Sequence, residues 1–350
     1  MEKIIEPVSL ELLKAELTPE KKLIDTNKGG NEIYVVNWQN SPNVVREIGR
    51  LREVSFRTAG ASSGLSMDLD EFDTMENPYQ QIVVWDPDAQ AIVGGYRYIL
   101  GPDMVFTENG QPKLASAHMF KFSDEFIRSY LPHTMELGRS FVTPDYQSSK
   151  AGAKAIFALD NLWDGIVSVV LSHPSIIYFF GKMTFYPSYD STAFDLIMHF
   201  LWKHFEDKDQ LVRPYDPVLT RSNPRLMDLI LAKDDLKQDY RCLKDAINRL
   251  GTHIPPLVNS YINTSATMKM CGTAVNHEFG EAIETAIMVN YNEIYDDKKE
   301  RHISSFENGY FERIKARFPK IGPEVIERLR ENREKRRMKR LKEFFEKAIK

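Results

Sequence analysis

The chain has 350 residues, of which 42 % are hydrophobic, a composition typical of a globular protein with one large core or two modest ones. Its 46 Lys and Arg nearly balance its 50 Asp and Glu, and no run of about 18 apolar residues occurs, which excludes a spanning helix. The N-terminal stretch MEKIIEPVSLELLK also lacks the long apolar segment of a signal peptide, so we expect a cytoplasmic protein.

The N-terminal part of the chain predicts a helix, a loop, a strand and a second helix. Residues 1–31 contain a short amphipathic pattern and then a polar run, which indicates a helix and a loop packed on the main domain. Residues 32–38 are rich in β-branched and aromatic side chains and predict a first strand. Ser41 and Pro42 then begin a helix, as cap and first-turn residue. Arg52 lies at the edge of its apolar stripe, from where its side chain can reach inward.

An irregular segment and a hairpin follow this helix. Residues 58–78 form a long polar loop with two glycines and an acidic cluster, and long loops inside compact domains are more often functional than accidental. Residues 81–85 and 91–99 predict two antiparallel strands joined by a tight turn. A helical stretch at 124–130 then leads into a strand at 135–142.

The strand at 135–142 is where we expect the chemistry. Apolar residues alternate there with Glu136, Gly138 and Arg139. Glu136 and Arg139 are three positions apart, so in a regular strand their side chains point to opposite faces. Only a bulge or a strand end near Gly138 would let both side chains reach one pocket. The spacing by itself favours an internal ion pair.

Three earlier stretches complete a pattern with this strand. They are Leu51 to Phe56 (LREVSF), Asp68 to Asp73 (DLDEFD) and Gly95 to Tyr98 (GYRY). Together with the Glu136 strand they resemble the autoinducer-synthase-like branch of the GNAT acyltransferases. That branch includes acyl-homoserine-lactone synthases and the ornithine and glycine N-acyltransferases of bacterial lipid synthesis.

The resemblance assigns positions to the functional residues of that branch. Its members carry an arginine in an LR-x-x-x-F helix, a D-x-x-D pair ending in E-F-D, an arginine on the next strand and an E-x-x-R strand. In this sequence these positions are Arg52, Asp70, Asp73, Arg97, Glu136 and Arg139. The resemblance covers roughly residues 30–303 and implies an α/β, GNAT-like fold, a mixed twisted sheet flanked by helices.

The loop after the Glu136 strand departs from the GNAT pattern. GNAT enzymes commonly place an R/Q-x-x-G-x-G/A loop here, so that backbone N–H groups at a helix N-terminus hold the pyrophosphate of the donor. This chain keeps Gln147 and Gly152 but not the full motif. We expect these two residues to contact the donor. The incomplete loop favours a donor held by its acyl chain and phosphopantetheine arm, as on acyl carrier protein.

The next elements predict the centre of the sheet and its cover. A helix is expected at 150–171, and the continuous apolar run at 175–182 predicts a strand in the middle of the sheet. The helix expected at 189–205 carries a stripe of Met and aromatic residues. This stripe belongs either to the core or to a tunnel for an acyl chain.

The last third of the main domain predicts helical additions and further strands. Residues 226–250 are amphipathic and predict an inserted helical pair, 267–275 is hairpin-like, and 282–290 predicts a last strand. The run PPLVNSY at 255–261 resembles the P-P-L-x-x-x-Y helix of the lipid-synthesis N-acyltransferases, whereas acyl-homoserine-lactone synthases are shorter and lack it. This resemblance favours amino-acid N-acylation.

The tail at 304–350 is predicted to be a basic amphipathic helix. Residues 313–350 carry 15 Lys and Arg against 6 Asp and Glu, while the rest of the chain is acidic. A narrow apolar stripe flanked by cations suits an anionic bilayer surface, with a solvated or packed helix and an acidic carrier protein as alternatives. Nucleic acid is not expected, because aromatic stacking residues are few there and no reading motif accompanies the charge.

The chain offers carboxylates and guanidiniums rather than a nucleophile or a metal site. It has no Gly-x-Ser-x-Gly elbow, and its histidines lack metal-ligand spacing. Cys242 and Cys271 have no CxxC spacing and are expected to be free thiols. No metal and no tightly bound cofactor is therefore expected.

Transfer of an acyl group from a thioester to an amine needs a base and donors to the tetrahedral oxyanion, but no acyl-enzyme. We expect Glu136 to be the base, directly or through a water, and Arg139 to orient Glu136 or the carboxylate of the substrate. Arg52 and Arg97 are further candidates to clamp that carboxylate. Asp70 and Asp73 would hold the arginines. The alternative is a satisfied buried network without a catalytic member.

These observations lead to one expected function and two alternatives. A GNAT-like domain at 32–303 would transfer a long, possibly 3-hydroxylated, fatty acyl group from acyl carrier protein, or from coenzyme A, to the α-amine of glycine or ornithine. The first alternative is acetyl-coenzyme A-dependent acetylation of a small amine. The second is a non-catalytic peripheral lipid-binding protein.

Overall fold

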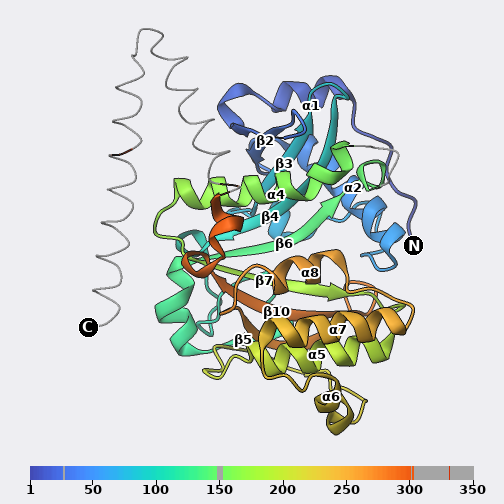
Figure 1. Cartoon of the computed structure of the whole chain (residues 1–350). Coiled ribbons are helices and arrows are strands. Elements are labelled where there is room, and N and C mark those ends of the chain that lie inside the picture. The colour runs from blue at the N-terminus through green and yellow to red at the C-terminus, as the bar shows by residue number, and fades with distance from the viewer. Residues whose placement is uncertain (27, 148–152, 301, 303–330, 332–350) are drawn as a thin grey trace.

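A mixed β-sheet forms the centre of the protein (Figure 1). The computed structural model describes residues 1–26, 28–147, 153–300, 302 and 331. Within them, eight strands pair in the order β1-β2-β3-β4-β6-β7-β10-β9. The strands are β1 (Lys22–Asp25), β2 (Glu32–Val36), β3 (Gln80–Asp86), β4 (Ala91–Leu100), β6 (Thr134–Val142), β7 (Tyr178–Phe185), β9 (Lys269–Asn276) and β10 (Ala282–Asn290). All neighbours are antiparallel except β6 and β7, which are parallel.

Helices cover both faces of this sheet. The longer ones are α2 (Pro42–Ala59), α4 (Ala153–Ser172), α5 (Ser191–Phe205) and α7 (Leu236–Arg249). The shorter ones are α1 (Leu10–Glu16), α3 (Glu71–Thr74), α6 (Pro224–Ile230), α8 (Pro256–Ile262) and a π-helical turn at Phe126–Tyr130. A separate two-stranded ribbon pairs β5 (Phe120–Phe122) with β8 (Val212–Pro214).

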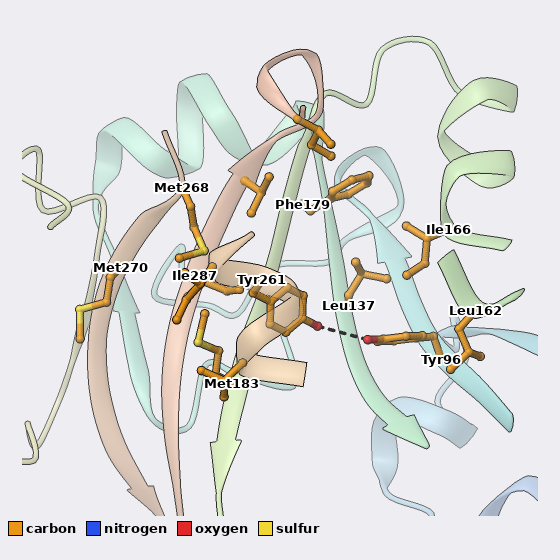
Figure 2. Close-up of a cluster of buried hydrophobic side chains, with 14 of the residues drawn as sticks. Tyr96, Leu137, Leu162, Ile166, Phe179, Met183, Tyr261, Met268, Met270 and Ile287 are labelled. Atoms are coloured by element: carbon orange, nitrogen blue, oxygen red, sulfur yellow. Dashed lines mark hydrogen bonds between the residues drawn. The ribbon is translucent and has the colours of Figure 1, made fainter. Parts of the chain in front are cut away.

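The two faces of the sheet contribute to different hydrophobic clusters, because successive residues of a strand point to opposite sides. On one face, α4, α5, α7 and α8 pack against alternate strand residues, as in the cluster of Figure 2. There the Tyr261 hydroxyl of α8 lies 3.2 Å from the Tyr96 hydroxyl of β4. On the other face, one cluster gathers under α2 and a second gathers around Phe180 and the β5–β8 ribbon. The functional side chains lie on this second face.

The structure confirms most of the predicted elements. The hairpin at 81–99, the strand that carries Glu136, the interior position of the 175–182 run and the helical pair at 226–250 are all present, with boundary shifts of a few residues. One prediction was wrong in part: 267–275 is not a hairpin but one strand, β9, which pairs with β10. Strand β1 and the β5–β8 ribbon were not predicted, because all three strands are short, and the two strands of the ribbon lie about 90 residues apart in the sequence.

None of the described helices has the length and hydropathy needed to cross a membrane. The predicted tail at 304–350 lies outside the described residues, except for residue 331.

Candidate functional site

A band of charged side chains crosses the α2 face of the sheet between two apolar clusters. Its first member is Arg52 of α2, whose side chain is fully buried. The Arg52 guanidinium donates to Asp73 Oδ1 at 3.1 Å and to Gln81 Oε1 of β3 at 2.5 Å. A buried guanidinium is tolerated only where partners replace the water that it loses. Arg52 therefore joins α2 to the loop and the sheet.

The D-x-x-D pair owes its geometry to one short helix. Asp70 is the N-cap of α3 and accepts the backbone N–H groups of Phe72 and Asp73, while the Asp73 carboxylate accepts the Asp70 N–H. This reciprocal capping box fixes two carboxylates three residues apart. Both then accept hydrogen bonds from Arg97 of β4, at 2.7 Å for Asp70 and 2.9 Å for Asp73.

Burial and ion pairing act in opposite directions on these aspartates. Burial raises the pKa of Asp70, but the Arg97 charge and hydrogen bond, with Arg139 and Arg52, outweigh it and hold the pKa well below its ordinary value of 3.8. For Asp68 burial prevails over the arginines, and the pKa is raised. Asp68 is 2 % exposed.

Arg139 reaches this band because the strand backbone is irregular there. The register between β4 and β6 shifts between Gly95 and Arg97, and Arg139 has a φ of +50°, in the left-handed region. The Arg139 Nε lies 3.1 Å from Asp68 Oδ2, and its guanidinium stacks 4.7 Å above the ring of Phe279. The bulge expected near Gly138 is thus present, and it directs Arg139 toward Asp68 and Asp70.

Glu136 is held by partners other than Arg139. Its carboxylate accepts the hydroxyl of Tyr79, the hydroxyl of Ser116 at 2.5 Å and the backbone N–H of Ser116 at 3.2 Å. Glu136 is 4 % exposed. Burial and the neighbouring Glu136 carboxylate raise the pKa of the Tyr79 hydroxyl well above its ordinary value, so Tyr79 remains a donor. The Arg97 guanidinium lies 5.3 Å from the centre of the Tyr79 ring and links the two halves of the band.

The strand register places Glu136 beside the arginine cluster. Ile99 pairs with Glu136 and Arg97 pairs with Gly138, so these side chains share one face of the sheet. The parallel pairing of β6 with β7 ends at Glu136 and Phe180, although both strands continue for several residues. Beyond Glu136 the facing edges of β6 and β7 are therefore not joined by a regular ladder.

A further ion pair, between β7 and β10, extends the band toward β10. Lys182 Nζ lies 2.5 Å from Glu284 Oε2, which also accepts the Asn276 amide at 3.0 Å. Burial raises the pKa of Glu284, but Lys182, with smaller contributions from Arg139 and Asn276, lowers it overall. In the sequence, Lys182 is only the polar residue at the end of the apolar run 175–182, and no motif assigns it a role.

Sequence reasoning missed several members of the site. Asp68 lies within the DLDEFD stretch, but the resemblance assigns a role there only to Asp70 and Asp73. Tyr79 and Ser116 belong to no sequence motif. The structure describes only part of the predicted donor loop. Gln147 donates to the Val142 carbonyl at 2.5 Å, and Gly152 lies outside the described residues. Among the described residues, no group of three or more His, Cys, Asp or Glu is arranged to hold a metal ion.

Comparison with known proteins shows the family of this chain. A model of the acetyltransferase (GNAT) domain matches residues 51–155, the segment that carries Arg52, Asp70, Arg97 and Glu136. A glycine N(alpha)-acyltransferase of Bacteroides thetaiotaomicron is 55 % identical over 306 residues, which are 87 % of this chain and 91 % of that protein. The chain belongs to this N-acyltransferase family. A glycine N(alpha)-acyltransferase of Phocaeicola vulgatus is 53 % identical over 315 residues, 90 % of this chain and 97 % of that protein.

A solved structure, that of a CoA-dependent acyl-homoserine lactone synthase with SAM and isopentyl-CoA, covers 79 % of this chain and 90 % of its own. Its sequence identity is 13 % and its TM-score 0.35, too low to bear on the argument.

The family membership confirms the main predictions. The protein is an N-acyltransferase that acts on an amino acid, and it has an α/β GNAT-like fold. The reading as a non-catalytic lipid-binding protein was therefore wrong. The charged band, with Glu136 at its centre, is the candidate active site.

Proposed function

We propose that this N-acyltransferase moves a long-chain fatty acyl group from a thioester on acyl carrier protein to the α-amine of glycine. The product is an N-acylglycine. Glycine is supported by two relatives that are more than half identical to this chain and that are named glycine N(alpha)-acyltransferases. The observation that carries the mechanism is the buried Glu136 carboxylate, which Tyr79 and Ser116 hold at the edge of an arginine cluster.

The reaction forms one C–N bond and breaks one C–S bond. Glycine arrives as an ammonium, and Glu136, directly or through a water, takes one proton to free the lone pair. The amine nitrogen attacks the thioester carbonyl and gives a tetrahedral oxyanion. As the intermediate collapses, the thiolate leaves and the second proton passes from nitrogen to sulfur. The thioester is already activated, so the protein needs no nucleophile of its own.

We assign the carboxylate of glycine to Arg139. Arg52 is fully buried and its guanidinium is committed to Asp73 and Gln81, and Arg97 is almost as buried and is committed to Asp70 and Asp73. The side chain of Arg139 is 18 % exposed, against 0 % for Arg52 and 4 % for Arg97, so its guanidinium is the most accessible of the three to a substrate. In this assignment Arg52, Arg97, Asp70 and Asp73 position Arg139 and shape the site.

The donor is assigned from the loop and from the sheet. The loop with Gln147 and Gly152 has an incomplete phosphate motif, which favours a donor held along its phosphopantetheine arm. Beyond Glu136 the edges of β6 and β7 have no regular ladder, and such edges can hydrogen-bond an extended amide-containing arm. The acyl carbonyl would then lie next to Glu136.

The first test measures transfer with purified protein. Acyl carrier protein carrying a long-chain acyl thioester is incubated with glycine, ornithine, serine or alanine, and N-acyl products are quantified by mass spectrometry. We expect acylation of glycine, and we expect Glu136→Gln to lower kcat/KM by about 10²–10⁴-fold, the usual contribution of a general base. The exposed Glu11→Gln is the matched control and should match the wild type.

Two outcomes contradict the proposal. If no amino acid on the panel is acylated, or if Glu136→Gln retains full activity, the assignment of substrate or base is wrong. A parallel series with long-chain acyl-coenzyme A and acetyl-coenzyme A tests the donor. Preference for acetyl-coenzyme A would support the small-amine acetylation reading instead.

We also propose that the basic tail at 304–350 brings the enzyme to an anionic membrane surface on the cytoplasmic side. Its sequence combines a narrow apolar stripe with many cations, each of which contributes on the order of 1 kcal/mol near an anionic surface.

A further inference from the structure

Arg97 of β4, Gly138 of β6 and Lys182 of β7 come from three neighbouring strands and lie on one face of the sheet. Arg97 pairs directly with Gly138, and Lys182 is two residues beyond Phe180, which pairs with Glu136. Because alternate residues of a strand share a face, Lys182 points to the same side as Phe180 and Glu136, the side of the charged band. We call the space above Gly138, between Arg97, Glu136 and Lys182, the Gly138 notch.

The notch exists because β6 has a glycine at this position. Apart from the adjacent residues of its own strand, a Cβ on Gly138 would have Arg97 Nε as its nearest described neighbour, 3.9 Å away. On the parallel strand β7, a Cβ on Gly181 would lie 3.1 Å from the Leu137 carbonyl oxygen. Gly181 thus stands beside Leu137, and the next residue, Lys182, stands level with Gly138. No side chain of β6 separates the two cations there.

Both cations that border the notch keep N–H donors for a further acceptor. Arg97 Nη1 donates to Asp70 and Asp73, but the buried Arg97 Nε has no hydrogen-bond partner among the described residues. A buried donor without an acceptor is unfavourable, so the notch suits an acceptor oxygen. The Lys182 ammonium has three donors, and Glu284 is its one partner in the part of the chain that the structure describes.

Glu284 holds Lys182 from the buried side. Its carboxylate accepts the Asn276 amide at 3.0 Å as well as the Lys182 ammonium at 2.5 Å. Burial raises the pKa of Glu284, but Lys182 and, more weakly, Arg139 of β6 lower it overall. Since the charge of Arg139 reaches Glu284, this ion pair lies close to β6. The Lys182 side chain is 15 % exposed and that of Glu284 is 5 % exposed, so the ammonium is the accessible partner.

The notch lies where β6 and β7 part. Their ladder ends at Glu136 and Phe180, and Figure 1 shows the two strands diverging toward their C-terminal ends. Just beyond this last pair, Gly138 and Lys182 occupy the facing edges of the two strands. An acyl thioester whose arm lies between these strands therefore brings its carbonyl group to the notch, beside Glu136.

We propose that the Gly138 notch holds the oxygen of the thioester carbonyl, and that Lys182 is a catalytic residue that donates to the oxyanion. When the amine nitrogen attacks, the π electrons of the carbonyl move onto this oxygen. Lys182 Nζ and Arg97 Nε then donate hydrogen bonds to it, and both keep their protons. When the C–S bond breaks, the electrons return and the carbonyl re-forms. Donors fixed in advance where charge develops lower the barrier without reorganisation.

The inference rests on the proposed function in one respect, the position of the thioester between β6 and β7. It supplies the oxyanion donor that acyl transfer requires and that the base does not provide. Glu136 and Lys182 then have separate tasks on either side of the notch. The first takes the proton from the amine, and the second stabilises the charge on oxygen.

The first experiment compares steady-state kinetics of Lys182→Met and the wild type. Loss of one oxyanion donor typically lowers kcat by about 10²–10³-fold, and we expect that loss here with little change in the KM for glycine. Lys182→Arg keeps a cationic donor and should retain at least about ten times the kcat of Lys182→Met. Lys203→Met is the matched control, because Lys203 of α5 also pairs with a buried carboxylate, Asp239, at 2.9 Å. It should leave kcat unchanged.

A double variant separates catalysis from stability. Lys182→Met leaves the buried Glu284 without its cation, which destabilises the fold, whereas Lys182→Met/Glu284→Gln removes both charges and should restore much of the stability. We expect the kcat of the double variant to stay as low as that of Lys182→Met. If kcat recovers together with stability in urea unfolding, the ion pair is structural only and the inference is overturned.

Infrared spectroscopy reads the hydrogen bond directly. The protein is mixed, without any amino acid, with an acyl thioester that carries an isotopic label at its carbonyl. We expect a lower carbonyl stretching frequency in the wild type and in Lys203→Met than in the free thioester, and a return toward the free value in Lys182→Met. No shift in the wild type, or an equal shift in Lys182→Met, overturns the inference.

Gly138→Ala tests the notch itself. The methyl group would make only an ordinary contact with Arg97 Nε, so the fold should be kept, but it would occupy the place of the carbonyl oxygen. We expect kcat/KM for the thioester to fall about tenfold or more, because misplacing a reacting group is costly. A stable Gly138→Ala variant with the activity of the wild type contradicts the position of the oxyanion.

The same kinetic comparison distinguishes this inference from the proposed function. An oxyanion forms with every thioester and every amino acid, so kcat is compared with the donor and the acceptor that the wild type uses best. If these are acetyl-coenzyme A or an amino acid other than glycine, the proposed function fails, and Lys182→Met still decides the role of Lys182. If glycine and a long-chain donor are confirmed but Lys182→Met keeps the kcat of the wild type, or raises only the KM for glycine, the proposed function stands and the role of Lys182 is wrong.

Discussion

At the scale of single residues, the site depends on buried charges that are individually unfavourable. Arg52 and Asp73 are fully buried, and Arg97 and Glu136 are nearly so. Each is stable because its partners replace the water it has lost, and removing one partner from such a pair typically costs about 3–5 kcal/mol. Asp73 pairs with two arginines at once, Arg52 and Arg97.

Tyr79 is the positioning residue for Glu136, and its removal is the residue-scale prediction. Tyr79→Phe deletes the hydroxyl that donates to Glu136, but keeps the ring under Arg97. A hydrogen bond to a charged group is worth about 1.5–3 kcal/mol, so we expect kcat to fall roughly tenfold or more. The KM for glycine should change little, because Tyr79 touches the base and not the proposed carboxylate ligand.

The matched control is Tyr34→Phe, which also removes a hydroxyl that donates to a carboxylate, that of Glu32, far from the band. It should leave kcat unchanged. Equal effects of the two variants on kcat, or a Tyr79→Phe effect confined to thermal stability, would show that Tyr79 has a structural role only.

At the scale of elements, two neighbouring glycines set the shape of β4 where it passes the site. A Cβ on Gly94 would lie 2.4 Å from the Phe141 carbonyl oxygen of β6, and a Cβ on Gly95 would lie 2.6 Å from the Ile82 carbonyl oxygen of β3. These close backbone approaches stand next to the register shift between Gly95 and Arg97. Glycines inside a strand commonly mark such a bulge.

Gly94→Ala tests this role. The new methyl group would meet backbone atoms that cannot rotate away, so we expect the free energy of unfolding to fall by roughly 1–3 kcal/mol, as for other overpacked sites. Gly138→Ala, on the paired strand, is the control for stability, since its Cβ would lie 3.9 Å from the nearest atom, Arg97 Nε. The free energy of unfolding of both variants is measured with urea. Equal values for Gly94→Ala and Gly138→Ala would contradict the predicted steric clash at Gly94.

At the scale of the whole molecule, the sheet uses its two faces differently. One face is covered by α4, α5, α7 and α8 over a continuous apolar cluster, whereas the other holds the charged band between two apolar clusters. Because the charged side chains of the band come from α2, the segment around α3 and the strands β4, β6, β7 and β10, its charge state influences the stability of the entire domain.

This coupling predicts acid sensitivity. The folded-state pKa values of Asp70 and Glu284 lie below their ordinary values of 3.8 and 4.5. The unfolded chain therefore binds protons first as the pH falls, and the stabilisation present above about pH 4.5 is lost progressively below it, by up to about 1.4 kcal/mol per pH unit and group. The raised pKa of Asp68 acts in the opposite direction.

The measurement is urea unfolding between about pH 2 and 6. Glu284→Gln should be less stable than the wild type at pH 6 and should lose less stability as the pH falls. A free energy of unfolding that is independent of pH in this range would contradict the electrostatic account.

Much of the fold and part of the site were predictable because their signals are local. Helical and alternating periodicity identified α2, the β3–β4 hairpin and the Glu136 strand, each from residues only a few positions apart. The D-x-x-D spacing is local for the same reason, since it is the capping box of one short helix. These patterns reflect interactions within a single element, which sequence spacing records directly.

By itself, the sequence thus determined the kinds of elements, several of the charged residues that form the band and the family that they resemble. Only the tertiary structure decided which groups meet. Tyr79 and Glu136 are 57 positions apart, and Arg139 pairs with Asp68, a partner that the spacing around Gly138 does not indicate. The Gly138 notch likewise exists only because β4, β6 and β7 are neighbours in the sheet. Hydrophobic periodicity shows which face of an element is buried, but it does not show which distant segment packs against that face.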